Sequence, residues 1–345
     1  MRKNLFCTIF VAIIVSIFAP RSQACSGMEL KTKNGDVVMA RTIEWSGSDM
    51  NSFYVVVPKG NTPTTKFAYI GIAVELPQYI MEGINEKGLS AGLFYFPDYG
   101  KYESEDEGEG KISVSDFELV GYILSCCENI DDVKRTLDGL HIHSVDPRSS
   151  TVHWRFIEES GRQVVLEIID GKYVFYENTL GVLANSPSFD YHLTNLNNYV
   201  NLTPGRAADN SIRNLKMSSF SGGTAMLGLP GDYSSPSRFV RLAFLQNTAP
   251  IKDTPLQTVV QAFHLLNNFD IPIGMQFSKD QEAVDIPSAT HVTVVSDLKG
   301  RKLYYRTMHN CEIRCIDLAK INFKKTGYLY KPLDKVKSET IHQIF

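Results

Sequence analysis

The sequence has no excess of positive charge, and this argues against nucleic acid as a partner. Its 345 residues include 35 Lys and Arg against 38 Asp and Glu, a formal net charge of −3. Proteins that bind nucleic acid gather Lys and Arg into basic runs or patches that neutralise phosphates. No long basic run is present here. Because 43% of the residues are hydrophobic and 21% are charged, the composition is that of a globular protein with a large core.

The chain also lacks internal repeats, Pro- or Gly-rich linkers and a second long apolar run. The missing linker predicts a single domain over residues 25–345, and no later run reaches the ~18–20 apolar residues that span a bilayer. Paired metal ligands are missing as well. Cys311 and Cys315 form a half-site without a matching pair, and His141 and His143 share a strand face without a third ligand. We therefore expect no metal site.

The first 24 residues have the pattern of a secretory signal peptide. Arg2 and Lys3 precede an apolar run over residues 5–19, and Ser22 and Ala24 supply small residues at the third-last and last positions. We predict cleavage after Ala24 and export to the periplasm or the exterior. Loss of this segment removes three basic residues, so the mature chain would carry a formal net charge of −6.

Cleavage after Ala24 would make Cys25 the first residue of the mature protein. Such a residue carries a thiol nucleophile together with an α-amine, which titrates near pH ~8 and can serve as a general base. Two other readings stay open, namely cleavage elsewhere and lipid attachment to Cys25. Lipoprotein signals normally have an aliphatic residue where this chain has Ser22. Five cysteines remain after cleavage, and because this number is odd, at least one thiol is unpaired. The five are Cys25, Cys126, Cys127, Cys311 and Cys315.

Two strand-like runs flank Asn34-Gly35, a strong hairpin signal near the predicted N-terminus. A two-residue turn at this dipeptide would pair Cys25 with Glu44 and place a carboxylate within ~5 Å of the new terminus. Since side chains alternate along a strand, Arg41 and Glu44 would then point to opposite faces.

The remaining pattern alternates blocks of strands with pairs of helices, which favours an α+β fold with antiparallel sheets. Helices are expected from Ser115, from Asp131 to Gly139, over residues 237–246 and over residues 256–269. Strands are expected over residues 25–30, 36–45, 79–83, 89–96, 151–158, 163–169, 173–177, 181–185, 292–296 and 303–308.

An ordered set of short motifs, spread over nearly all of residues 25–330, resembles one family. The set resembles the choloylglycine hydrolases (bile salt hydrolases) and penicillin V acylases, which are N-terminal-nucleophile hydrolases. Each motif alone is weak, but the ordered set is specific. The motifs are Cys25 after the signal, Ala40-Arg41-Thr42-Ile43-Glu44-Trp45, Gly83-Ile84-Asn85-Glu86-Lys87-Gly88-Leu89, Asn185-Ser186-Pro187, Gly228-Leu229-Pro230-Gly231-Asp232 and Ser237-Arg238-Phe239.

The resemblance implies a four-layer αββα sandwich and hydrolysis of a linear amide without a cofactor. It implies that Cys25 is the nucleophile and that Arg41 and Arg238 are the two active-site arginines. Glu44 matches a position that is usually Asp, so its carboxylate would hold the α-amine through a side chain one methylene longer.

The resemblance also implies two oxyanion donors, which are the Asn185 side-chain amide and the backbone N–H of Tyr95. An ungapped count selects Phe94 in place of Tyr95. Penicillin V acylases often have Tyr at this position, whereas bile salt hydrolases often have Asn. Trp45, Phe94 and Phe96 would either line an apolar acyl pocket or pack in the core.

Family members act mainly on conjugated bile salts or penicillin V. Bile salt hydrolysis is favoured as the commoner activity, with N-acyl homoserine lactones as a third substrate class. The long segment at about residues 200–225 matches the one that members use to assemble homotetramers. A different class of function, a lipid-anchored binding protein attached through Cys25, would share the signal but has no need for Arg41, Asn185 and Arg238.

Overall fold

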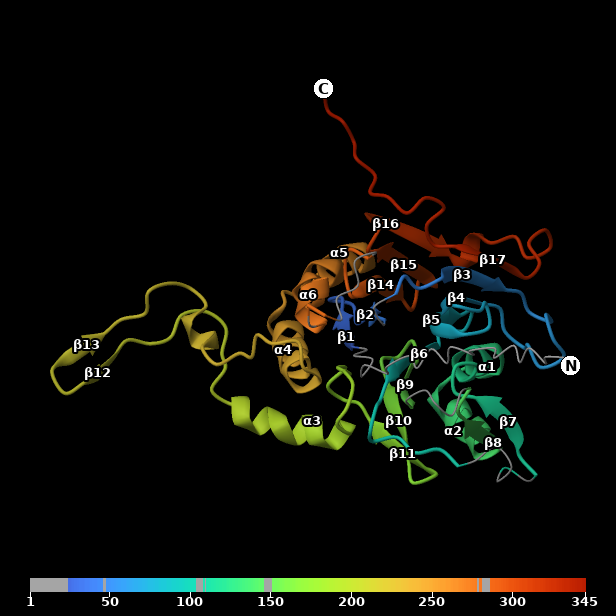
Figure 1. Cartoon of the computed structure of the whole chain (residues 1–345), viewed down its shortest axis with the longest axis horizontal. Coiled ribbons are helices and arrows are strands. Elements are labelled where there is room, and N and C mark those ends of the chain that lie inside the picture. The colour runs from blue at the N-terminus through green and yellow to red at the C-terminus, as the bar shows by residue number, and fades with distance from the viewer. Residues whose placement is uncertain are drawn as a thin grey trace, which may run out of the picture.

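Two antiparallel sheets face each other, and helices cover their outer sides (Figure 1). This computed structural model describes residues 24–45, 48–103, 108, 110–145, 151–277, 279–280 and 286–345. The predicted signal peptide therefore lies outside the described residues, except for Ala24. Within the described part of the chain, no helix is both long and apolar enough to cross a bilayer.

The smaller sheet contains Cys25 and has five strands in the order β1-β2-β14-β15-β16. Its central strands are buried on both faces, which explains their continuous apolar and β-branched runs. Helices α4 and α5 pack on the outer face. The elements are β1 (Cys25–Lys31), β2 (Val37–Glu44), β14 (Thr290–Asp297), β15 (Lys302–Thr307), β16 (Asn310–Asp317), α4 (Ser235–Thr248) and α5 (Pro255–Leu266).

The larger sheet has eight strands in the order β11-β10-β9-β6-β5-β4-β3-β17, and helix α1 packs on β5 and β6 while α2 packs near β9. These elements are β3 (Ser52–Val57), β4 (Tyr69–Val74), β5 (Ile80–Asn85), β6 (Ser90–Tyr95), β9 (Val152–Ile157), β10 (Gln163–Ile169), β11 (Lys172–Glu177), β17 (Leu329–Pro332), α1 (Leu119–Cys126) and α2 (Ile130–Asp138). The layer order is helix, sheet, sheet, helix, so the predicted αββα sandwich is confirmed.

Smaller elements surround the two sheets. Strands β7 (Ile112–Ser115) and β8 (Leu140–His143) form a parallel pair, and α6 (Ile273–Gln276) lies between α5 and β14 in the chain. Helix α3 (Phe189–Asn195) continues into the 3-10 turn η2 (Leu196–Tyr199), and further 3-10 turns are η3 (Thr224–Met226), η4 (Asn267–Phe269) and η5 (Leu318–Lys320). The expected strand over residues 181–185 is wrong, because this segment is irregular apart from one bridge between Gly27 and Leu183.

The predicted register of the first hairpin is wrong by one residue. Gly35 takes the left-handed conformation with φ of +84°, so the turn has three residues and not two. Thr32 N–H donates to the Asp36 carbonyl at 3.0 Å, and Gly35 N–H donates to the Thr32 carbonyl at 2.9 Å. As a result Cys25 pairs with Ile43, and Gly27 pairs with Arg41.

This register decides which side chains share a face with Cys25. Directly paired residues point to the same side of an antiparallel ladder, and side chains alternate along each strand. Cys25 and Arg41 therefore lie on one face. Glu44 points to the other face, as expected from its odd spacing from Arg41.

A long excursion leaves the two sheets between α3 and α4 (Figure 1). It carries the short hairpin β12 (Asn210–Ile212) and β13 (Leu215–Met217), which pair only with each other. Several large apolar side chains on it are exposed; they are Val200, Ile212, Leu215, Phe220 and Leu227. We call residues 200–227 the arm.

Candidate active site

Cys25 begins β1 and is almost fully buried, with 1% of its surface exposed. Arg41 on the neighbouring strand β2 donates from Nη2 to the Cys25 sulfur at 2.9 Å. A guanidinium at this distance stabilises a thiolate more than a neutral thiol. The arrangement is therefore suited to nucleophilic chemistry at the sulfur.

Arg41 is held rigidly by the larger sheet. Its Nη1 donates to the carbonyls of Met81 and Leu93, and its guanidinium carbon lies 4.0 Å from the centre of the Phe94 ring. The side chain has no exposed surface. Because these contacts fix the guanidinium plane, they also fix the direction in which Nη2 of Arg41 donates to the Cys25 sulfur.

Asn185 reaches Cys25 from the irregular segment that follows β11. Its Oδ1 accepts hydrogen bonds from the backbone N of Cys25 at 2.6 Å and from Nη2 of Arg238 at 2.7 Å. Its Nδ2 donates to the Tyr95 carbonyl at 2.7 Å. Since Oδ1 faces two donors and Nδ2 faces an acceptor, only one orientation of the amide satisfies all three partners.

Arg238 lies on α4 and approaches Cys25 from the helical layer. Its Nη1 donates to the Cys25 carbonyl and, at 2.9 Å, to Ser26 Oγ. Its Nε donates to the Tyr233 carbonyl at 2.9 Å. Burial lowers the pKa of Arg238, and nearby Glu44 opposes that shift. The guanidinium therefore holds the carbonyl of Cys25 and the side chain of Ser26.

Glu44 lies beside the residue that precedes Cys25. Its backbone N–H donates to the Ala24 carbonyl at 3.1 Å, and its Oε1 accepts from Thr290 Oγ1 at 2.9 Å. Burial raises the pKa of Glu44 to about 7, although Arg238 pulls it down. A chain that began at Cys25 would have its new amine near the backbone of Glu44.

The backbone of β6 presents polar groups toward the site. The carbonyls of Leu93 and Tyr95 face Arg41 and Asn185, respectively. The N–H and C=O of one strand residue point to the same edge of the strand. The Tyr95 N–H consequently lies on the edge that faces Asn185, whereas Phe96 N–H donates away from it, to Thr151.

The three aromatic residues predicted for substrate binding differ in exposure. Phe94 and Phe96 are fully buried, Phe94 beneath Arg41 and Phe96 stacked on His153 with ring centres 4.5 Å apart. Both belong to the core in this structure, which was the alternative reading of the sequence. Trp45 is half-buried and packs against the core between the sheets.

The sequence did not reveal several residues that shape the site. His192 on α3 donates from Nε2 to the Asn185 carbonyl at 2.7 Å, and Ser235 accepts from the Asn185 N–H at 2.9 Å. Glu82 and Arg155 lie beneath Arg41 and have no exposed surface. Glu82 and Arg155 could have been noticed in the sequence, because each is a charged residue inside a largely apolar strand.

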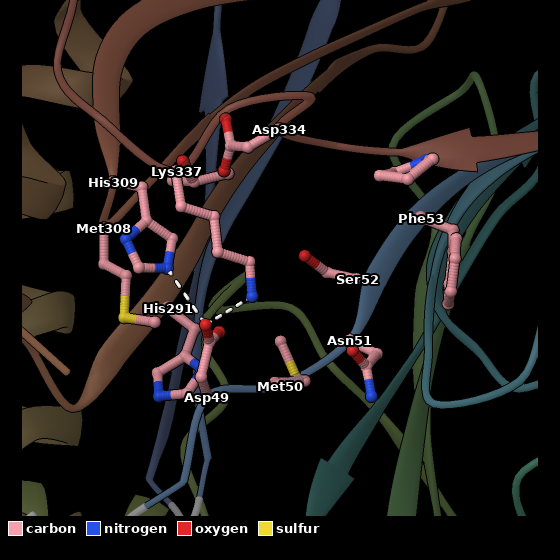
Figure 2. A pocket seen from close by; sticks show the side chains of 12 residues that line it. Asp49, Met50, Asn51, Ser52, Phe53, His291, Met308, His309, Asp334 and Lys337 are labelled. Carbon is pink, nitrogen blue, oxygen red and sulfur yellow. Dashed lines mark hydrogen bonds and ion pairs between the residues drawn. The ribbon is translucent and has the colours of Figure 1, made fainter. Parts of the chain in front are cut away.

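A separate group of titratable side chains surrounds a cavity of about 210 Å³ at the edge of the molecule. Figure 2 shows His309 and Lys337 both approaching Asp49 there, and Cys25, Arg41, Asn185 and Arg238 are not among its twelve lining residues. Among the residues that the structure describes, no three His, Cys, Asp or Glu side chains are grouped to hold a metal ion. Cys126, Cys127, Cys311 and Cys315 are free thiols.

The chain matches the model of the family described as linear amide C–N hydrolases, choloylglycine hydrolase family, over residues 25–331. It is 31% identical over 312 residues to a bile salt hydrolase/transferase of Clostridium perfringens, covering 86% of this chain and 93% of that protein. It is 27% identical to a penicillin V acylase of Pectobacterium atrosepticum, covering 73% of this chain and 65% of that protein.

Two solved structures are similar as well. A crystal structure of a variant conjugated bile acid hydrolase from Clostridium perfringens matches with a TM-score of 0.79 and 29% identity, covering 93% of this chain and all of that one. A penicillin V acylase from Agrobacterium tumefaciens matches with a TM-score of 0.71 and 24% identity, covering 90% and 91% of the two chains, and supports the fold alone. Family model, relatives and structure agree, and the chain therefore belongs to the choloylglycine hydrolase family of linear amide C–N hydrolases.

Proposed function

We propose that the mature protein begins at Cys25 and uses this residue as the nucleophile to deconjugate glycine- and taurine-conjugated bile salts. The observation that carries the proposal is the convergence of Arg41, Asn185 and Arg238 on Cys25. They come from a strand, an irregular segment and a helix, which are otherwise far apart in the chain. A merely structural cysteine needs no such set of buried polar groups.

The first step requires a base on the nitrogen of Cys25. While Ala24 is attached, this nitrogen is an amide and has no basic lone pair. Once Ala24 is removed it becomes an amine, held by Asn185 Oδ1 and close to Glu44. The thiol proton then passes to this amine, and Arg41 stabilises the thiolate.

The thiolate attacks the substrate carbonyl carbon and forms a tetrahedral oxyanion. Asn185 Nδ2 has two hydrogens, one of which is engaged by the Tyr95 carbonyl, so the second is free to donate to the oxyanion together with Tyr95 N–H. The C–N bond breaks as the ammonium of Cys25 protonates the leaving nitrogen. Water then hydrolyses the thioester, which releases the acid and restores the thiol.

The substrate preference rests on the relatives. Several are named as bile salt hydrolase/transferase or conjugated bile acid hydrolase, and about 31% identity links this chain to members from three bacterial genera. Penicillin V is the second candidate, supported by the acylase relative and by Tyr95. N-acyl homoserine lactones remain the third class, and Trp45, which is half-buried, is the best placed of the three aromatic residues to contact the acyl group.

A side-by-side assay tests the proposal. We expect release of glycine from glycocholate and taurine from taurocholate to exceed release of phenoxyacetate from penicillin V at equal enzyme concentration. Cys25→Ala is the matched control and should abolish turnover of all three, while Cys25→Ser should keep at most weak activity. Full turnover by Cys25→Ala would refute the nucleophile, and a higher rate on penicillin V would reverse the substrate assignment.

Export and cleavage after Ala24 belong to the same proposal. Mass spectrometry of the purified protein should find Cys25 at the N-terminus with a free α-amine. A diacylglyceryl group on Cys25 would instead support the lipid-anchored binding protein. Fully active protein that retains residues before Cys25 would contradict the mechanism.

A further inference from the structure

A third buried guanidinium, which the mechanism above does not use, lies near Cys25. Arg155 on β9 has no exposed surface. Among the described residues, Nε, Nη1 and Nη2 of Arg155 have no hydrogen-bond partner. A buried cation without hydrogen bonds is costly, and its presence calls for an explanation.

Arg155 lies next to Cys25 on the same face of β1. A Cβ added to Gly27 would come within 2.6 Å of Arg155 Nη1, so the guanidinium occupies the place of the missing Gly27 side chain. Gly27 is two residues from Cys25, which puts the cation about 7 Å from that side chain. The Phe94 ring is within 5.1 Å of Arg155 and 4.0 Å of Arg41, measured from each guanidinium carbon to the ring centre.

A single carboxylate serves both guanidiniums. Glu82 on β5 lies 3.6 Å from Arg41 Nη1 and 3.9 Å from Arg155 Nη2. Gly92 makes room for it, because a Cβ there would overlap the carboxylate. Burial raises the pKa of Glu82, and the two arginines oppose that shift.

The charge count of this cluster explains what Arg155 adds. Arg41 and Glu82 alone would form a neutral pair. With Arg155 these three side chains have two cations and one anion and therefore a net positive charge; Glu29 and Cys25 are the further anionic groups that act on Arg155. A thiolate at Cys25 is the negative charge that would compensate it.

We propose that Arg155 is a positioning residue that keeps the Arg41–Glu82 cluster net positive and thereby stabilises the thiolate of Cys25. This inference rests on the proposed role of Cys25 as nucleophile. Other charged or titratable groups around Cys25 are not altered in the test below; they are Glu29 on β1, Arg41 and Glu44 on β2, His192 on α3 and Arg238 on α4.

The test follows the alkylation of Cys25 by iodoacetamide as a function of pH. Peptide mass spectrometry of the mature protein separates this thiol from Cys126, Cys127, Cys311 and Cys315. Arg155→Met removes the extra cation and should move the midpoint to higher pH by about 1–2 units, as expected for a unit charge at ~7 Å in a medium of intermediate dielectric constant. Arg155→Lys keeps the charge and should stay near the wild-type midpoint.

Glu82→Gln provides the opposite change, because it leaves both guanidiniums uncompensated and should move the midpoint to lower pH. The double variant Arg155→Met/Glu82→Gln has the wild-type net charge and should return the midpoint to within a few tenths of a unit. Shifts of opposite sign that cancel are not produced by loss of packing. Far-UV circular dichroism verifies folding of each variant.

An unmoved midpoint in Arg155→Met, or shifts of the same sign in both single variants, would overturn the inference. If Arg155→Met does not fold, the comparison of Glu82→Gln with the double variant decides, and equal midpoints in those two overturn it. The proposed function fails separately. Wild-type turnover by Cys25→Ala would refute the role of Cys25 as nucleophile, while the alkylation profiles would still report the effect of Arg155 on the thiol.

Discussion

The Asn185 side chain makes three hydrogen bonds that connect Cys25, Arg238 and Tyr95. Its oxygen accepts from the Cys25 nitrogen and from Arg238, and its nitrogen donates to the Tyr95 carbonyl. A substitution therefore removes three hydrogen bonds and leaves a buried guanidinium with one partner fewer. The expected loss is greatest in the transition state, where the second hydrogen of Nδ2 would meet the oxyanion.

Asn185→Ala should lower kcat by roughly 10²–10³, the usual effect of removing one oxyanion donor, with a smaller change in KM. Steady-state kinetics with glycocholate measures both constants. Asn198→Ala, at an exposed asparagine on η2, is the matched control and should leave both constants unchanged. A rise in KM at constant kcat would make Asn185 a binding residue.

His192 supports Asn185 from behind. It donates from Nε2 to the Asn185 carbonyl at 2.7 Å and stacks on Phe239 with ring centres 4.6 Å apart. Burial lowers the pKa of His192 to about 4, from a usual value near 6.5. The imidazole is therefore neutral in the folded protein at neutral pH.

This lowered pKa predicts a dependence of stability on pH. Below pH ~6.5 the unfolded chain binds a proton at His192, whereas the folded protein binds it only near pH 4. The contribution of neutral His192 to the free energy of unfolding is therefore complete above pH ~6.5 and is lost as the pH falls toward 4. Over that range the loss is about 3 kcal/mol for this group. His192→Gln keeps a donor for the carbonyl without titrating. Urea unfolding between pH 4 and 7 should show a shallower dependence in this variant, and equal slopes would contradict the assignment.

At the scale of elements, local patterns predicted most strands and helices but not how they meet. The two strand-like runs on either side of Asn85 predict β5 and β6, and apolar residues at helical spacing predict α4 and α5. The edge strands β16 and β17 were not predicted, because they carry polar residues on exposed faces. Cys25 lies 160 positions from Asn185 and 213 from Arg238, so only the family resemblance brought them together before the structure did.

The first hairpin shows where a local pattern is insufficient. Asn34-Gly35 correctly marks a turn, but the dipeptide does not say whether the loop has two or three residues. The left-handed conformation of Gly35 settles this and shifts the pairing by one. That shift is what places Cys25 and Arg41 on the same face.

Gly35 is therefore expected to be a sensitive position in the hairpin. A Cβ at Gly35 has no neighbour within 4 Å, so a substitution tests the backbone conformation alone. Gly35→Val should lower the free energy of unfolding by about 1–2 kcal/mol. Gly35→Asn should cost less, since asparagine tolerates this conformation. Urea unfolding of both variants measures the difference, and equal losses would argue against a left-handed requirement.

At the scale of the whole molecule, the arm extends far from the two sheets (Figure 1). Its large apolar side chains are exposed and are not packed in a hydrophobic core of the described structure. Such a surface is suited to contact with another copy of the chain. We propose that the arm assembles a homotetramer.

Deletion of residues 201–221 should therefore yield smaller particles in light scattering coupled to size-exclusion chromatography. Ile212→Ser combined with Phe220→Ser should act in the same direction without shortening the chain. Leu256→Ser, at an exposed apolar residue on α5 outside the arm, is the control and should leave the particle size unchanged. An unchanged size after the deletion would mean that the arm serves its own subunit.

The charged side chains around Cys25 are shielded from dissolved salt. Arg41, Glu82, Arg155 and Arg238 have at most 1% of their surfaces exposed, so dissolved ions do not come between them. Screening with a Debye length of about 8 Å at physiological salt acts on charges that face water and much less on buried ones. Added sodium chloride should therefore leave kcat nearly constant. The electric field at the Cys25 sulfur is thus set by the fold and changes little between dilute buffer and concentrated salt.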